Sequence, residues 1–282
     1  WDTTPLFVAA HEGRRDIAQM LVAAGADVNS VVTSDGTSEW VEINDKMFPL
    51  LEAAERGHVD VVRDLLAAGA DCKMASPVTG TTALYVAAGE GHLEVVRELL
   101  SKDADPKQAR TDDGTTPVFV AAGEGHLDVL RALLANGGDP NQATTDDGAT
   151  PVYVAAQNGH LGVVRELLSA DADPNQARTT DGATPVYVTT QYGHLEVLRE
   201  LLSADADPNR ARTDDGATPV YMAAWKGHLD VLRALLANGG DPKQANTTTG
   251  ATPVYIAAWK GHLDVLRALL ANGADPKQAK TD

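Results

Sequence analysis

Apolar side chains recur along this chain in short clusters, and glycine, proline and aspartate separate the clusters. Residues 162–169 show one apolar face at the spacing of a helix. Residues 152–158 form a second apolar stretch, which Thr150 and Pro151 precede as a helix N-cap and a first helical residue. Gly159 lies between the two stretches, where a helix can end. The pattern therefore predicts two short helices joined by a tight turn, and then a polar turn segment.

This helix pair repeats along the whole chain. A Gly-His pair recurs every 34 residues from Gly57-His58 to Gly261-His262. A diverged copy carries Gly13, which lies 44 residues before Gly57, one period plus an insertion of 10. Two helices this short cannot bury their own apolar faces, so they are stable only when stacked on neighbours. We expect an all-α solenoid of eight repeats, at 1–35, 46–79, 80–113, 114–147, 148–181, 182–215, 216–249 and 250–282, with the insertion at 36–45.

The repeat unit resembles a known family. Residues 150–175 read TPVYVAAQNGHLGVVRELLSADADPN, which is similar to the ankyrin repeat pattern TPLHxAAxxGHxxVVxxLLxxGADxN. The resemblance covers essentially the whole chain. It implies stacked helix–turn–helix units with turn or hairpin fingers, and a concave groove, built from the turn tips and the first helices, that binds a partner protein or peptide.

The sequence departs from that pattern in three ways. The repeat has 34 residues, whereas the ankyrin repeat has about 33. The glycine of GAD is replaced by Asp103, Asp171 and Asp205, which should cost stability because aspartate tolerates the left-handed conformation less well. The motif histidine is also replaced, which puts its hydrogen bond to the turn in doubt; its place is taken by Phe7, Leu51, Tyr85, Phe119, Tyr153, Tyr187, Tyr221 and Tyr255.

The insertion predicts one elongated finger. Two β-branched or aromatic runs, Val31–Thr33 and Trp40–Ile43, flank Asp35-Gly36, which is a hairpin turn signal. We expect a β-hairpin here with Trp40 on it. The hairpin would either bind a partner or fold back over the first repeats, because an exposed hairpin needs something to pack against.

The two residues before Gly-His vary while the framework repeats. They are small or polar in the middle of the chain and become aromatic and cationic at Trp225-Lys226 and Trp259-Lys260. Exposed Trp and Tyr are common interface anchors. The predicted partner-binding strip is Tyr192, Met222, Trp225, Lys226, Ile256, Trp259 and Lys260. The alternatives are that a chance tryptophan was copied by duplication, or that the indoles pack on the lysine stems without any partner.

Composition and charge narrow the class of partner. The net charge is −17, so phosphate backbones are repelled and nucleic acid is a poor partner, whereas a basic protein or peptide is attracted. The alternative is that this charge selects no partner and only keeps an elongated molecule in solution. No apolar stretch approaches the ~20 residues of a membrane span. The single Cys72 favours a reducing compartment, and hence the cytoplasm or nucleus. The start at Trp1 without a methionine indicates an excised fragment or a processed product, from which a targeting signal could have been lost.

No residue pattern points to an enzyme, a metal or a cofactor. Equivalent histidines in stacked repeats lie about 8–10 Å apart, too far to share a zinc ion with bonds of about 2 Å, so we expect them to cap and pack. Gly89-Glu90-Gly91 lacks the third glycine of a phosphate loop. The second function class left open is a structural or designed array, acting as a spacer or assembling end to end. Repeat 8 keeps the interior pattern of Leu263 and Leu266 and lacks a polar cap. We therefore expect either that the array continues or that this end packs against another molecule, for example by end-to-end self-association.

Overall fold

The computed structural model describes residues 3–33 and 46–278, and its helices confirm the all-α architecture of helix–turn–helix repeats. The chain divides into two compact units, unit 1 at Trp1–Asp146 and unit 2 at Asp147–Asp282. Two helices fall within each of the eight predicted repeat ranges. We call the first helix of each repeat a first helix and the other a second helix.

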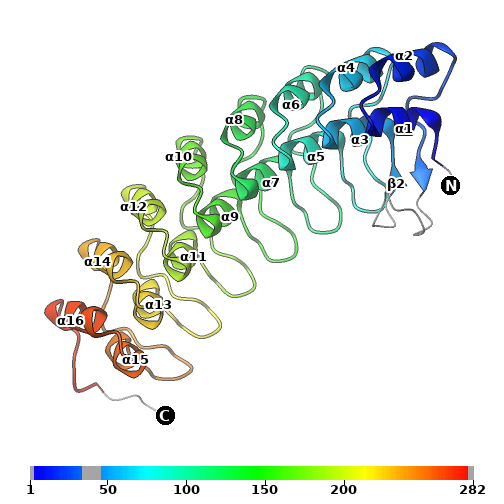
Figure 1. The fold of residues 1–282 in the computed structure, drawn as a ribbon. Helices are drawn as coiled ribbons and strands as arrows, with labels where there is room; N and C mark the ends of the chain where they lie inside the picture. Colours follow the sequence, from blue (N-terminus) through cyan, green and yellow to red (C-terminus); the bar gives the residue numbers. More distant parts are fainter. Residues whose placement is uncertain (1–2, 34–45, 279–282) are drawn as a thin grey trace. The chain divides into compact units, whose positions relative to one another are not determined.

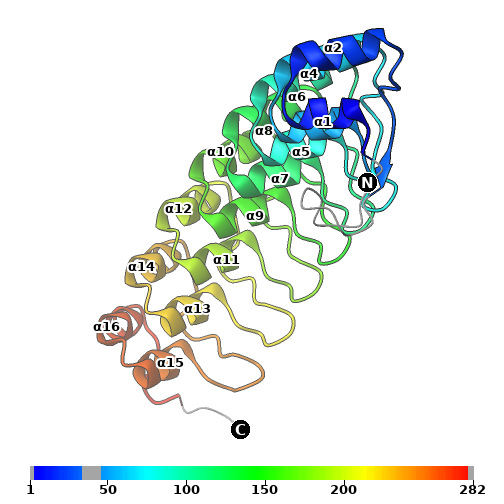
Figure 2. The same cartoon turned by 45° about the vertical axis from the view of Figure 1, so that its right-hand side comes forward.

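In unit 1 the first helices form one row and the second helices form another (Figures 1 and 2). Each first helix packs on the next first helix and on its own second helix. The apolar side chains at the boundary of these rows, such as Leu84, Val96 and Leu99, are almost fully buried. The helices are α1 (Pro5–His11), α2 (Arg15–Ala23), α3 (Pro49–Glu55), α4 (Val59–Ala67), α5 (Ala83–Gly89), α6 (Leu93–Leu100), α7 (Pro117–Glu124) and α8 (Leu127–Ala135).

Unit 2 is built in the same way. Its first helices carry Val152, Val186 and Val220 into a core that Leu167, Leu201 and Leu235 of the second helices complete, and all six are 0% exposed. The helices are α9 (Pro151–Asn158), α10 (Leu161–Ser169), α11 (Pro185–Tyr192), α12 (Leu195–Ser203), α13 (Pro219–Lys226), α14 (Leu229–Ala237), α15 (Pro253–Lys260) and α16 (Leu263–Ala271).

The predicted helix boundaries are confirmed in α9. The Thr150 side chain accepts a hydrogen bond from the backbone N–H of Tyr153, and Pro151 is the first helical residue. Gly159 ends the helix in the left-handed conformation at φ 78°. A side chain at Gly159 would also collide with His194, because an added Cβ would lie 2.8 Å from the imidazole. The glycine is therefore required twice, by its own backbone and by the next repeat.

The segments between repeats form fingers, which we name by the repeats they join. In the finger between repeats 5 and 6, Arg178 N–H donates to Ala183 O at 2.9 Å, and Gly182 N–H donates to Arg178 O. Neighbouring fingers are also joined, since Thr179 N–H donates to Asp147 O and Thr213 N–H donates to Asp181 O, both at 2.8 Å. The fingers thus continue the stacking that the helices begin.

Two short strands lie at the base of the insertion. Strand β1 (Val32–Thr33) pairs antiparallel with β2 (Lys46–Met47), with Val32 opposite Met47. Val32 is buried, so the first predicted β run does enter the packed structure. The second predicted run, Trp40–Ile43, and the Asp35-Gly36 turn lie outside the described residues.

The three aspartates that replace the GAD glycine adopt the strained conformation expected from the sequence. Their φ angles are 63°, 61° and 59° at Asp103, Asp171 and Asp205, whereas the same turn in repeat 7 has Gly239 at 85°. A left-handed conformation at a residue with a Cβ costs about 1–2 kcal/mol, less for aspartate than for most others. These turns therefore carry a local strain that the glycine-containing repeats lack.

Candidate functional site

The structure brings the two predicted tryptophans together on unit 2. Trp225 lies in the last turn of α13 and Trp259 in the last turn of α15, and these helices are packed neighbours. The ring centroids are 5.8 Å apart with an interplanar angle of 69°, which is a favourable edge-to-face arrangement. Trp225 remains 36% exposed and Trp259 63% exposed. The pair is therefore an open aromatic surface and not part of the core.

Lys260 adds a cation to this surface. Its Nζ lies 4.5 Å from the ring centroids of both Trp225 and Trp259. This distance is within the range of a cation–π interaction, which favours one orientation of the two indoles. Packing on a lysine stem was one of the alternatives without a partner, but it leaves both rings accessible. The lysine therefore orders the aromatic pair without covering it.

The other predicted residues differ in their exposure. Tyr192 of α11 is 51% exposed, and its ring stacks on His194 at a centroid distance of 6.3 Å. Lys226 is exposed and Met222 is half-buried. Ile256 is only 2% exposed, so the expectation that it extends the surface is corrected: its side chain belongs to the core. Trp40 lies outside the described residues.

The Gly-His histidines act between repeats, as their capping and packing interpretation predicts. His92 Nε2 lies 2.9 Å from Glu55 O, and His126 Nε2 lies 2.9 Å from Gly89 O, both carbonyls of the preceding repeat. In unit 2, His194 contacts Gln157 O and His262 contacts Trp225 O in the same way. The imidazoles thus satisfy carbonyl groups near the ends of the first helices.

A set of arginine–tyrosine stacks was not anticipated from the sequence. Arg178 Cζ lies 5.5 Å from the ring centroid of Tyr153, and Arg212 lies at the same distance from Tyr187. Burial raises the pKa of Tyr153 to about 12. The ring face of the tyrosine thus packs on the arginine of the finger, and in repeat 3 the Tyr85 hydroxyl also accepts a hydrogen bond from Thr115 Oγ1 at 3.2 Å. The signal was in the sequence, because Tyr85, Tyr153 and Tyr187 are each followed 25 residues later by arginine, whereas Phe119 is followed by Thr144.

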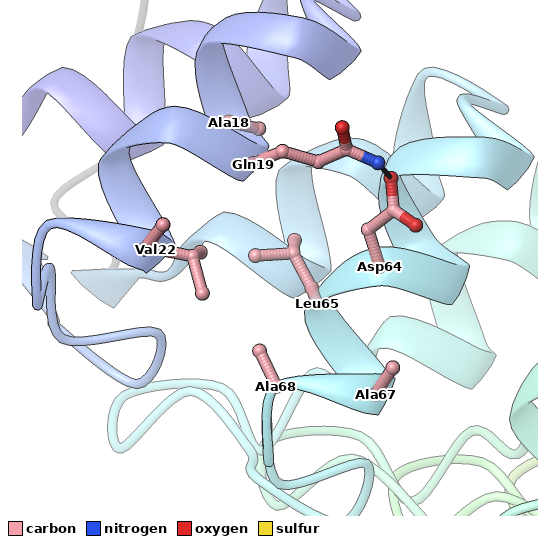
Figure 3. Close-up of a pocket in the computed structure, with 8 residues that line it drawn as sticks. Ala18, Gln19, Val22, Asp64, Leu65, Ala67 and Ala68 are labelled. Atoms are coloured by element: carbon pink, nitrogen blue, oxygen red, sulfur yellow. Dashed lines mark hydrogen bonds between the residues drawn. The ribbon is translucent and has the colours of Figure 1, made fainter.

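Open pockets lie between neighbouring second helices. One of about 310 Å³ is lined by residues of α2 and α4, and Gln19 Nε2 donates to Asp64 Oδ2 at 2.9 Å beside it (Figure 3). A pocket of about 350 Å³ occupies the same repeat position between α10 and α12, where Arg165 Nε donates to Glu200 Oε2 at 2.7 Å. Because both units repeat this feature, it reflects the stacking of second helices and not a built ligand site.

The remaining candidates for chemistry are structural. Cys72 Sγ donates to Lys102 O at 2.8 Å, and burial together with Asp71 raises the pKa of the thiol, which disfavours the nucleophilic thiolate. Within residues 3–33 and 46–278, no cluster of histidine, cysteine, aspartate or glutamate is arranged to hold a metal ion. In the same part of the chain, every helix is too short or too polar to cross a bilayer.

The stacked helix pairs, the fingers and the exposed aromatic pair define a helical repeat protein, and the sequence comparisons identify its kind. Residues 50–144, 118–212, 175–246 and 191–280 match the family described as ankyrin repeats (3 copies), and residues 1–32 match that described as ankyrin repeat. The chain belongs to the ankyrin repeat family. Ankyrin repeats are generally protein–protein interaction modules and are generally not enzymes.

A solved structure supports the assignment. The crystal structure of the human ASB11 ankyrin repeat domain is similar to this chain with a TM-score of 0.70 and 25% sequence identity. The similarity covers 82% of this chain and 100% of that domain. A comparison with curated proteins gives no match.

Proposed function

We propose that the first-helix face of unit 2 binds a partner protein or peptide, with Trp225 and Trp259 as its anchors. The observation that carries this proposal is the exposed indole pair, which is ordered by Lys260 but not covered. A tryptophan side chain has about 150–250 Å² to bury. Covering the open part of Trp259 would contribute about 2–3 kcal/mol.

The alternative function is a structural array that acts as a spacer or assembles end to end. Leu263 and Leu270 of α16 are 55% and 41% exposed, so the predicted self-association through repeat 8 remains a second proposal. The reducing, intracellular location also remains an expectation. The two functions differ in their surface, because self-association through α16 does not require the tryptophans of α13 and α15.

The test is a double variant, Trp225→Ala/Trp259→Ala, immobilised beside the natural chain. A matched control, Ile17→Ala/Met20→Ala, removes two apolar side chains of α2 that are 52% and 73% exposed. Quantitative mass spectrometry of proteins retained from a cell extract should show binders that the natural chain and the control share and the tryptophan variant loses. We expect at least a tenfold loss, as for anchor residues of about 2 kcal/mol or more.

Thermal and urea unfolding of the same variants decide between binding and packing. The free energy of unfolding of the tryptophan variant should fall by far less than the ~3–5 kcal/mol that replacing a core tryptophan by alanine costs. A stability loss of that size, or an unchanged set of retained proteins, would refute the proposal.

A further inference from the structure

The aromatic surface lies in a part of unit 2 whose charge is opposite to that of the chain. The whole chain carries a formal charge of −17. The four first helices of unit 2, α9, α11, α13 and α15, nevertheless contain no aspartate or glutamate. The ionised side chains on this row are Lys226 and Lys260, one in the last turn of α13 and one in the last turn of α15. The helices that carry the tryptophans are therefore locally positive.

The finger that leads into α15 lacks acid at its tip as well. The finger between repeats 7 and 8 reads NTTTG at residues 246–250, whereas the preceding one carries Asp214 and Asp215 at the same positions. Thr247 N–H donates to Asp215 O at 2.9 Å, which places the two fingers side by side. The carboxylates of the earlier finger thus have no counterpart in the finger that leads into α15.

Several carboxylates of unit 2 are already paired with arginine, whereas Asp215 Oδ1 accepts a hydrogen bond from Ala217 N–H at 2.9 Å. Asp181 lies 3.3 Å from Arg178 Nε and 3.6 Å from Arg212 Nη2, and Asp214 forms an ion pair with Arg212. On the second helices, Asp230 pairs with Arg233 and Asp264 pairs with Arg267. By contrast, neither Lys226 nor Lys260 makes an ion pair within the described part of the chain. The two lysines are thus left without an ion-pair partner among the described residues.

We infer that the partner segment is acidic: an apolar or aromatic side chain covers Trp225 and Trp259, and flanking carboxylates reach Lys226 and Lys260. This inference rests on the proposed function and names its ligand class. It reverses the expectation of a basic partner, which came from the net charge. Salt screens charges beyond about 8 Å at physiological ionic strength, so the lysines at the surface outweigh distant carboxylates once the partner is in contact.

Three synthetic peptides test the charge preference by isothermal titration calorimetry with the full chain. Each peptide has a central Leu-Phe pair, flanked on both sides by glutamates, by lysines or by serines. We expect the glutamate peptide to bind at least tenfold more tightly than the serine peptide, and the lysine peptide to bind most weakly. The advantage of the glutamate peptide should shrink at high salt.

Two double Lys→Glu variants, which change the net charge equally, show which lysines cause the preference for the glutamate peptide. Lys226→Glu/Lys260→Glu should abolish or invert the preference for the glutamate peptide. The control Lys243→Glu/Lys277→Glu changes two exposed lysines in turns after second helices by the same net charge, and should leave the preference intact. Both lysine pairs are exposed, so the variants should fold.

The result separates this inference from the proposed function. If the lysine peptide binds as tightly as the glutamate peptide, or both reversals act equally, the acidic-partner inference is wrong although the surface binds. If none of the three peptides binds, the inference is also overturned, and the retention experiment with Trp225→Ala/Trp259→Ala alone decides whether the surface binds a partner.

Discussion

Equivalent positions at the ends of the first helices are closed by a side-chain contact in unit 1 and left open in unit 2. His11 of α1 and Trp225 of α13 both lie two residues before a glycine, and both offer their backbone carbonyl to a histidine of the next repeat. Glu52 of α3 and Ile256 of α15 lie at a second equivalent position, five residues before the next such glycine. The backbones therefore match while the side chains differ.

In unit 1 the two side chains bind each other. His11 Nδ1 lies 2.6 Å from Glu52 Oε1, and their side chains are 14% and 5% exposed. In unit 2 the same positions hold an open indole and a buried Ile256. The comparison teaches that this surface position is closed by an internal contact at the first repeat and left open at the seventh. An open position with a large aromatic side chain is what the proposed binding surface requires, and internal packing does not account for it.

Removing the His11–Glu52 contact should have the largest effect on stability. Glu52→Val introduces the valine that repeat 6 has at the equivalent position, Val188. His11→Gln introduces the glutamine that repeat 5 has at the equivalent position, Gln157. We expect Glu52→Val to cost about 2 kcal/mol, because the contact is lost while the burial of His11 remains. Urea unfolding of the two single variants and the double variant should give a coupling energy of about 1–2 kcal/mol.

The stability of these variants should be measured locally as well as for the whole chain, because repeat proteins can unfold in parts. Hydrogen exchange in α1 and α3 is the matching local measurement. A coupling energy within the ~0.3–0.5 kcal/mol of independent sites would show that the His11–Glu52 contact does not close the position.

A second contrast concerns buried polar atoms. Glu52 is buried with hydrogen-bonding partners, whereas Thr189 Oγ1 in α11 is buried and has no hydrogen bond within the described residues. Its neighbour Thr190 is equally buried, but its Oγ1 donates to Val186 O at 2.8 Å. Repeats 5 and 7 have alanines at both positions.

The two threonines offer a matched pair of nearly isosteric changes. Thr189→Val should raise the free energy of unfolding by about 1 kcal/mol, because it removes a buried hydroxyl without a partner. Thr190→Val should lower it by about 1 kcal/mol, because it removes a hydrogen bond that is made. Equal effects of the two changes in urea unfolding would show that Thr189 does find a partner in solution.

The repeat period, the helix pairs and the fold were predictable because a 34-residue step in glycine, proline and apolar residues fixes them locally. The exposed tryptophans were predictable for the same reason, since their repeat position fixes the face. The prediction that Ile256 is exposed was wrong. It lies on the same helix as Trp259 but is buried, and its burial depends on the packing of the neighbouring repeat. The Arg178–Tyr153 stack was missed because it joins residues 25 apart, which a motif comparison treats separately.

The smallest expected effect comes from the turn after α12, compared with the turn after α14 in the same unit. Asp205 has φ 59° where repeat 7 has Gly239 at 85°. Asp205→Gly should relieve the left-handed strain, but glycine also gains freedom in the unfolded chain, so the net gain should be about 0.5 kcal/mol. Asp207→Gly is the control with the opposite sign, because Asp207 Oδ1 accepts a hydrogen bond from Asn209 N–H at 2.8 Å that the change removes. Urea unfolding that shows both variants destabilised would mean that the Asp205 side chain contributes more to its turn than its backbone strain costs.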